Sequence, residues 1–162
     1  MKKALVEQLI ATIKEEIERA TKAAKDAAEG ATHVDNKPEG DKDMRSTEAS
    51  YIARGQAARV TEVVDALARL EGMPVKDFAE GARIESSALV DVDHDGKEST
   101  YLIVPAAGGR TLELADGKDK RKVTTLATTS PLGRALLGLT EGDDAEVQTP
   151  QGLRTHSVLR VR

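Results

Sequence analysis

The residues with the clearest chemical potential form an acidic cluster between positions 35 and 48. Its carboxylates are Asp35, Glu39, Asp41, Asp43 and Glu48, and basic residues lie among them at Lys37, Lys42 and Arg45. Carboxylate oxygens are the ligands that hard cations such as Mg²⁺ prefer, and these ions usually keep several of their waters. The cluster therefore indicates a site that holds Mg²⁺ or positions water. A solvated acidic loop without chemistry of its own is the alternative, and the residues alone leave both open.

A second acidic motif lies at residues 91–96, which read Asp-Val-Asp-His-Asp-Gly. This is the first half of a calcium-binding loop, in which alternating carboxylates supply oxygen ligands and the glycine makes the bend. The second half is missing, because the position of the bidentate glutamate is occupied by Leu102. No helix is expected on either side. We therefore interpret residues 91–96 as a hairpin turn.

Other catalytic chemistries find little support in the sequence. The chain has no cysteine, and its histidines, His33, His94 and His156, lie far apart. No Gly-x-Ser-x-Gly elbow is present to anchor a hydrolase triad. The glycines at positions 108 and 109 lack the rest of a phosphate-binding pattern, so we interpret them as a turn. The sequence predicts neither a zinc site nor a hydrolase.

Composition favours a protein as the main partner. The 162 residues include 24 Lys+Arg and 28 Asp+Glu, and the aromatic residues are Tyr51, Phe78 and Tyr101. Direct DNA binding is not expected, because a surface that follows a nucleic-acid backbone needs a basic excess and single strands stack on aromatic side chains. No apolar run approaches the roughly 18 residues of a membrane span, and the N-terminus lacks the apolar core of a signal peptide. We expect a cytoplasmic protein without membrane insertion.

The elements that would position the acidic cluster are two helices with heptad seams. Small and apolar residues recur at spacings of four and three, at Val6, Ile10, Ile13, Ile17, Ala20, Ala24 and Ala27, and at Ala49, Ala53, Gln56, Val60, Val63, Leu67 and Leu70. This spacing predicts an antiparallel coiled-coil hairpin, or finger, over residues 1–75 with an acidic tip loop at about 31–48. Its residues are bulky at the base and small near the tip, a shape suited to insertion. The core of a small bundle is the alternative.

The C-terminal half predicts a small β-rich domain over residues 83–162, joined by a linker at 76–82. Strands are expected at 88–92 and 99–104 around an Asp-Gly turn, and at 144–148 and 153–161. Between these hairpins, Ser130 provides an N-cap, Pro131 takes the first helical position and Gly138 closes a short helix. The predicted fold class is therefore α+β.

Residues 129–152 carry a resemblance to a known family. Ser130-Pro131 is followed by Arg134, Leu136, Leu137 and Gly138, then by Gly142-Asp143 and the turn Thr149-Pro150-Gln151-Gly152. This resembles the signature of the bacterial GreA/GreB transcript-cleavage factors, a Ser-Pro-x-x-Arg-x-Leu-(Leu/Ile)-Gly helix before a Gly-Asp strand and a Thr-Pro-x-Gly turn. The resemblance extends over nearly the whole chain and implies that the C-terminal domain is FKBP-like.

The resemblance also implies a function and a partner. The C-terminal domain would dock on RNA polymerase at the rim of the secondary channel, with partner-binding residues Ser130, Pro131, Arg134, Leu136 and Gly138. The finger would enter the channel, where Asp43, Glu48 and Asp41 act in the polymerase active centre and Asp43 and Glu48 share a Mg²⁺. The protein would then be a monomeric cofactor of the polymerase's own cleavage of backtracked RNA, which it contacts indirectly. It would be no enzyme itself and have no cofactor of its own.

The tip departs from the family pattern. Members that stimulate cleavage typically carry Gly-Asp-Leu-x-Glu-Asn-Ala-Glu-Tyr, whereas here five positions separate Asp43 from Glu48. The alternative is therefore a divergent, non-cleaving member that occupies the secondary channel and modulates or inhibits transcription. Two alternatives belong to other functional classes. One is a prolyl isomerase, for which the domain offers only Tyr101 as an aromatic lining. The other is a coiled-coil adaptor that dimerises through Ile10, Ile13 and Ile17.

Overall fold

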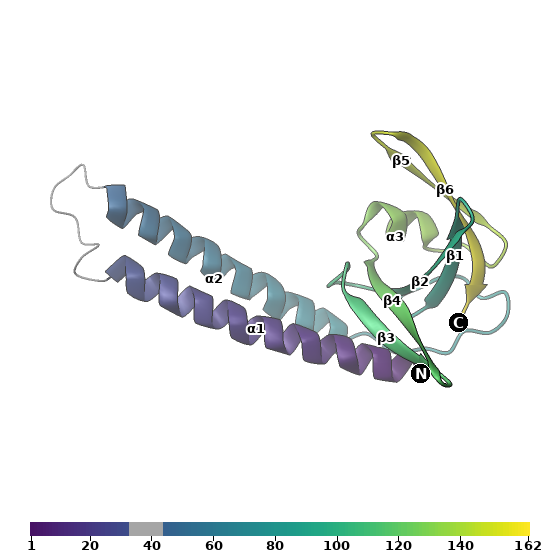
Figure 1. Ribbon diagram of the computed structural model, residues 1–162, viewed down its shortest axis with the longest axis horizontal. Helices are drawn as coiled ribbons and strands as arrows, with labels where there is room; N and C mark the ends of the chain where they lie inside the picture. The colour runs from purple at the N-terminus through teal and green to yellow at the C-terminus, as the bar shows by residue number, and fades with distance from the viewer. Residues whose placement is uncertain (33–43) are drawn as a thin grey trace. The chain divides into compact units, whose positions relative to one another are not determined.

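The computed structural model describes residues 1–32 and 44–162, which fall into two compact units (Figure 1). One unit is Ala11–Leu67, which contains most of a helical hairpin, and the other combines Met1–Ile10 with Ala68–Arg162 and contains a β-sheet. The predicted α+β class is confirmed, with a long helical hairpin followed by a β-rich domain that carries one short helix. No helix in the described ranges has an apolar stretch sufficient to cross a membrane.

The long helices are α1 (Lys2–Thr32) and α2 (Met44–Glu71). The predicted seams are confirmed, since every seam residue is buried or half-buried, and Ile13 and Val63 are among the buried ones. Within the unit Ala11–Leu67, Arg59 of α2 forms an ion pair with Glu16 of α1. The seams are therefore covered within one chain, so the adaptor hypothesis loses the exposed apolar stripe that it requires.

The described residues contain six strands that form one sheet. The strands are β1 (Leu89–His94), β2 (Lys97–Val104), β3 (Thr111–Asp116), β4 (Asp119–Ala127), β5 (Asp144–Thr149) and β6 (Gly152–Val161). Their order across the sheet is β3-β4-β2-β1-β6-β5. β1 with β2, β3 with β4, and β5 with β6 form antiparallel hairpins. The hairpins are joined by antiparallel pairing of β1 with β6 and by parallel pairing of β2 with β4.

The β1–β2 and β5–β6 hairpins confirm the prediction, whereas the β3–β4 hairpin was not predicted. Leu112 and Leu114 alternate with exposed neighbours along β3, and Gly117, at φ 66°, closes the turn. Alternation and an Asp-Gly pair are the signals of such a hairpin. They were present in the sequence, but the charged run at 118–122 obscures the second strand.

Both faces of the sheet bury apolar side chains. Helix α3 (Pro131–Leu136) packs against one face, where the core cluster includes Ile84, Val90, Val92, Ile103, Leu136 and Val158. Because side chains alternate along a strand, Leu89 and its cross-strand partner Leu102 lie on the opposite face, and both are fully buried. The sheet is thus the middle layer of its unit.

The first turns of α1 belong to the same unit as the sheet and contact it. The side-chain carbonyl of Gln8 accepts the backbone N–H of Glu113 on the edge strand β3, at 2.9 Å. The ammonium of Lys2 donates to the carbonyl of Lys76 and lies 4.5 Å from the ring centroid of Phe78. Burial lowers the pKa of Lys2, against an opposing contribution from Asp77. These contacts fix the start of α1 on the domain and cover part of an exposed strand edge.

Candidate functional site

The predicted catalytic and metal-binding residues are only partly described by the structure. Asp41 and Asp43 lie outside the described residues. Glu48 is described, and it is an exposed residue of α2, which begins at Met44. Since α1 continues to Thr32, helical residues occupy both ends of the stretch assigned to the tip loop. The predicted Mg²⁺ pair of Asp43 and Glu48 therefore remains a prediction.

The second predicted site, the segment at residues 130–138, is described completely. Ser130 is the N-cap of α3, because its hydroxyl oxygen accepts the N–H of Gly133 at 3.1 Å. The same hydroxyl donates to the carbonyl of Ala127 at 2.7 Å. Pro131 occupies the first turn, where its missing N–H removes no helical hydrogen bond. The predicted helix start is confirmed, and Ser130 joins the end of β4 to α3.

Gly133 allows α3 to approach the end of β4 closely. A Cβ atom at this position would lie 2.0 Å from the carbonyl oxygen of Ala127, which no side chain tolerates. Gly108 makes a second close approach, since a Cβ there would lie 2.8 Å from the Ala127 nitrogen. The backbone at Ala127 is therefore enclosed by glycines from two segments, which explains why the helix must carry glycine in its first turn.

The remaining signature residues divide into buried and exposed ones. Leu136 has no exposed surface and belongs to the core. Gly138, at φ 81°, donates its N–H to the carbonyl of Ile84 at 2.9 Å. Pro131 and Arg134 are exposed. Leu136 and Gly138 thus hold the helix in place, and the contact surface that the segment offers to a partner includes Pro131 and Arg134.

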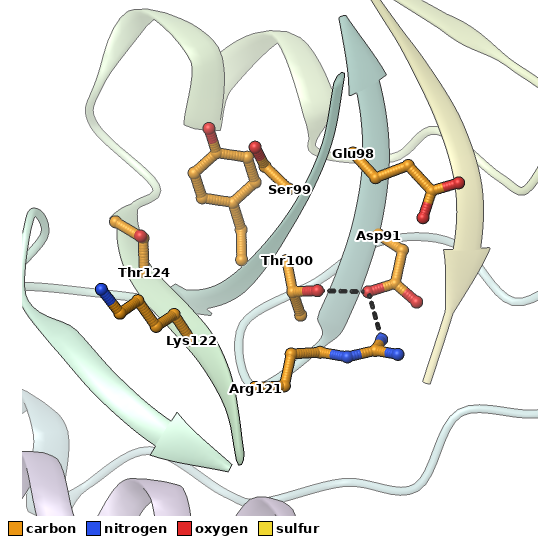
Figure 2. Close-up of a pocket in the computed structure, with 8 residues that line it drawn as sticks. Asp91, Glu98, Ser99, Thr100, Arg121, Lys122 and Thr124 are labelled. Atoms are coloured by element: carbon orange, nitrogen blue, oxygen red, sulfur yellow. Dashed lines mark hydrogen bonds and ion pairs between the residues drawn. The ribbon is translucent and has the colours of Figure 1, made fainter. Parts of the chain in front are cut away.

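A polar network that the sequence did not predict surrounds Asp91 (Figure 2). One carboxylate oxygen of Asp91 accepts the hydroxyl of Thr100 at 2.7 Å, and the other accepts a guanidinium N–H of Arg162 at 2.7 Å. Arg121 of β4 lies 3.8 Å from the first oxygen. The Asp91 side chain is only 11% exposed, so these partners compensate a carboxylate that is largely removed from water. The network ties β1, β2, β4 and the C-terminal residue together.

The same contacts settle the interpretation of residues 91–96. The Asp91 carboxylate accepts a hydrogen bond from Arg162, whereas a carboxylate oxygen of Asp93 accepts the N–H of Gly96 at 3.2 Å across the turn. The carboxylates therefore do not converge on a common point, and the hairpin turn is confirmed. No cluster of three or more residues suited to holding a metal occurs in the ranges 1–32 and 44–162.

Two histidines that are distant in sequence come together at the β1–β6 junction. The rings of His94 and His156 stack with centroids 4.5 Å apart and planes inclined by 22°. The His94 Nδ1–H donates to the carbonyl of Thr155 at 2.9 Å. Burial, then the positive charges of His94 and Arg154, lower the pKa of His156. Only the pairing of β1 with β6 creates this contact, so no local sequence pattern could have revealed it.

Comparison with known proteins identifies relatives of the chain. A family model described as "Transcription elongation factor, GreA/GreB, C-term" matches residues 81–162. The transcription elongation factor GreA of Hyphomonas neptunium is 37% identical over 106 residues, which are 64% of this chain and 60% of that relative. The chain thus spans less than two thirds of this relative. The GreA of Syntrophotalea carbinolica is 30% identical over 142 residues, covering 86% of this chain and 80% of the relative.

Among solved structures, the crystal structure of GreA factor homolog 1 (Gfh1) of Thermus thermophilus aligns with 94% of each chain. The identity is 20% and the TM-score is 0.38.

Proposed function

Because the chain belongs to the GreA/GreB family of transcription elongation factors, we propose that it acts on RNA polymerase as a Gre-type cofactor. Its C-terminal domain docks at the rim of the secondary channel, its helical hairpin enters the channel, and its tip stimulates cleavage of backtracked RNA. The protein acts in the cytoplasm as a monomer and has no cofactor of its own. The family match supports the role in transcription, and the finer steps are proposed from the residues below.

The observation that carries the docking step is the construction of the segment at 130–138. Its cap, its close glycine contact and its buried leucine fix α3 rigidly against the sheet. A rigid support presents the exposed Pro131 and Arg134 without a further ordering cost when a partner binds. Arg134 can donate bidentate hydrogen bonds to a carboxylate of that partner. We therefore assign Pro131 and Arg134 to direct contact with the polymerase.

The chemistry at the tip would be shared between two proteins. Asp41, Asp43 and Glu48 supply carboxylates, and Asp43 and Glu48 bind a Mg²⁺ of the polymerase active centre together with the attacking water. A metal ion in such a site increases the nucleophilicity of its bound water and stabilises charge on the scissile phosphate. This chain would lend ligands to that reaction rather than catalyse it alone, which is consistent with the exposed position of Glu48 on α2.

A second candidate function is regulation without cleavage. It is favoured by the five positions between Asp43 and Glu48 and by the start of α2 at Met44, which places Glu48 within the helix and Asp43 before it. In this alternative the protein occupies the secondary channel and inhibits or modulates transcription, while its tip carboxylates do not reach the metal.

The decisive experiment measures RNA cleavage in a reconstituted backtracked elongation complex made with the cognate polymerase. We expect the wild-type protein to stimulate cleavage and Asp43→Ala/Glu48→Ala to abolish the stimulation. A charge-matched control, Glu62→Ala/Asp65→Ala, changes exposed residues of α2 away from the tip and should cleave like the wild type. Wild-type protein that competes with a GreA factor for the polymerase without stimulating cleavage would establish the regulatory alternative.

The docking step has its own test. Arg134→Ala should weaken binding to polymerase in a sizing or pull-down assay while leaving the free energy of unfolding unchanged, because Arg134 is exposed. Arg160→Ala, which removes an exposed arginine from β6, is the control and should bind normally. Absence of polymerase binding by the wild-type protein would refute the proposed function as a whole.

A further inference from the structure

The sheet contains a gap between β2 and β4 (Figure 2). These strands are in parallel register only where residues 101–104 of β2 face residues 124–127 of β4. Before that point β2 continues in register with β1, and β4 continues in register with β3. In the described sheet, no β4 residue is paired with residues 97–100. The two strands therefore separate, and each keeps an edge that faces the other.

A cavity of about 380 Å³ occupies this gap. The residues that line it are Asp91, Glu98, Ser99, Thr100, Tyr101, Arg121, Lys122 and Thr124. Consecutive residues of a strand project to opposite faces of a sheet. The lining includes four such pairs, 98/99, 99/100, 100/101 and 121/122, so the cavity extends between the strands and does not lie on one face alone.

The main chain also turns its hydrogen-bonding groups toward the gap. The backbone N–H of Ile103 donates to the carbonyl of Ala88, and its carbonyl accepts the N–H of Ser87, so both groups point to the β1 side. Because these directions alternate along a strand, the N–H and carbonyl of even-numbered β2 residues such as Thr100 point toward β4. Both backbone groups of Thr125 bond away from β2, to Gly109 and Arg110. By the same alternation, Lys122 turns its backbone groups toward β2. An extended peptide placed in the gap would find donors and acceptors on both sides.

The lining carries two acids, Asp91 and Glu98, and two cations, Arg121 and Lys122, and the cations determine which peptide fits. Arg121 projects to the face that carries Asp91, whereas its neighbour Lys122 projects to the opposite face. Asp91 already accepts hydrogen bonds from Arg162 and Thr100, and Arg121 lies 3.8 Å from Asp91 and 3.6 Å from Asp116. An inserted strand sends adjacent side chains to opposite faces as well. Two consecutive acidic residues would therefore meet one cation each.

We propose that the gap between β2 and β4 binds an extended segment of a partner protein, which adds a strand there and directs two adjacent acidic side chains to Arg121 and Lys122. Addition of a strand to an exposed edge is a general mode of peptide recognition, in which main-chain hydrogen bonds give affinity and side chains give selectivity. No residue that lines the cavity belongs to the predicted tip or to α3, so the proposal does not depend on the proposed function.

The test uses the whole 162-residue chain labelled with ¹⁵N and a capped octapeptide of alternating threonine and valine with two glutamates at its centre. We expect saturable shifts of the amide signals of Glu98, Thr100 and Lys122, and slower hydrogen exchange of the Thr100 amide. The same peptide with N-methyl groups on its central residues should not bind, because it cannot pair with either strand. Equal binding of the two peptides, or no saturable shift at these amides, would overturn the proposal.

A matched pair of charge reversals tests the selectivity. Lys122→Glu should lower the affinity for the octapeptide by about tenfold or more, since an attractive contact becomes repulsive. Lys118→Glu changes the net charge equally on the same hairpin but lies outside the cavity lining. It should retain nearly wild-type affinity. An equal loss in both variants would mean that the peptide responds only to overall charge, and the site would be rejected.

Discussion

The helical hairpin and the sheet bury their apolar residues in different ways. In the described part of the unit Ala11–Leu67, the buried hydrophobic residues are Ile13, Ala20 and Val63, which lie along the seams of the two helices. In the other unit, both faces of the sheet are covered, and Leu89, Leu102 and Leu136 are fully buried. A seam depends on spacing, so residues of similar size can replace one another along it. The sheet unit depends on particular residues at particular places, and substitutions there should cost more.

The largest effect that we expect comes from Leu136→Ala in the core between α3 and the sheet. Removal of a fully buried leucine costs about 2–5 kcal/mol in free energy of unfolding, because the transfer energy is lost and a cavity remains. Urea denaturation would measure it. Leu137→Ala is the control, since Leu137 is the next residue in the chain and is 38% exposed. Equal losses in the two variants would contradict the described packing.

Asp91→Asn should have the next largest effect. The substitution removes the charge that Arg162 and Thr100 contact and leaves the arginine beside a neutral amide. Hydrogen bonds to charged groups contribute about 1.5–3 kcal/mol, and we expect a loss in that range from urea denaturation. Asp95→Asn, whose side chain is 90% exposed, should be nearly neutral. A neutral Asp91→Asn would mean that the network does not stabilise the sheet.

Ser130→Ala separates a structural from a binding role of the signature segment. Loss of an N-cap costs about 1 kcal/mol, and Ser130→Asp should restore only part of the stability, because aspartate also caps helices well but cannot donate to the Ala127 carbonyl. Thermal unfolding would follow both variants. If Ser130→Asp restores this part of the stability but no polymerase binding, the hydroxyl contacts the partner as well as the helix.

The stacked histidines predict a modest pH dependence of the sheet unit. The lowered pKa of His156 means that the folded protein binds its proton less readily than the unfolded chain does. Stability should therefore be highest at neutral pH and fall as the pH drops below the ordinary value of 6.5, until the folded-state pKa is passed. Urea midpoints of the wild type and His156→Gln between pH 7.5 and 5 would reveal it. Parallel profiles would exclude a contribution from this histidine.

We expect the smallest change in the free energy of unfolding from a substitution in the helical hairpin. The Arg59 side chain is 49% exposed, and its ion pair with Glu16 is therefore partly screened by solvent. We expect Arg59→Gln to cost about 0.2–1 kcal/mol, and less at high salt. The helical circular dichroism signal during urea denaturation at two salt concentrations would measure this. A loss as large as that of Leu136→Ala would reverse the contrast between the two units.

Local patterns allowed much of this structure to be predicted. Heptad spacing located both seams, and Ser130, Pro131 and Gly138 located the short helix, because these signals act over a few residues. The contact of Asp91 with Arg162 and the stacking of His94 on His156 were not predictable. Both depend on the pairing of β1 with β6, which no local spacing specifies.

The candidate sites also divide into one that a local pattern predicted and one that depends on long-range strand pairing. The signature at 130–138 was found in the sequence because cap, glycine and leucine follow one another in the chain. The gap between β2 and β4 was not found, since it exists only where two hairpins diverge after four paired residues. Lys122 looked like part of a solvated charged run, and its position beside a cavity became visible only in the assembled sheet.

The joining of separate hairpins into one sheet also bears on how the chain folds. Each hairpin closes a short loop and can form within about 1–10 μs, whereas pairing of β2 with β4 and of β1 with β6 requires contacts between distant residues. We expect the hairpins to form first and to exist briefly with unpaired edges. Edges of that kind invite pairing with neighbouring chains, and charged side chains discourage it. The charged run at 118–122 on the β3–β4 hairpin would then protect the protein from aggregation during the interval before the sheet is complete.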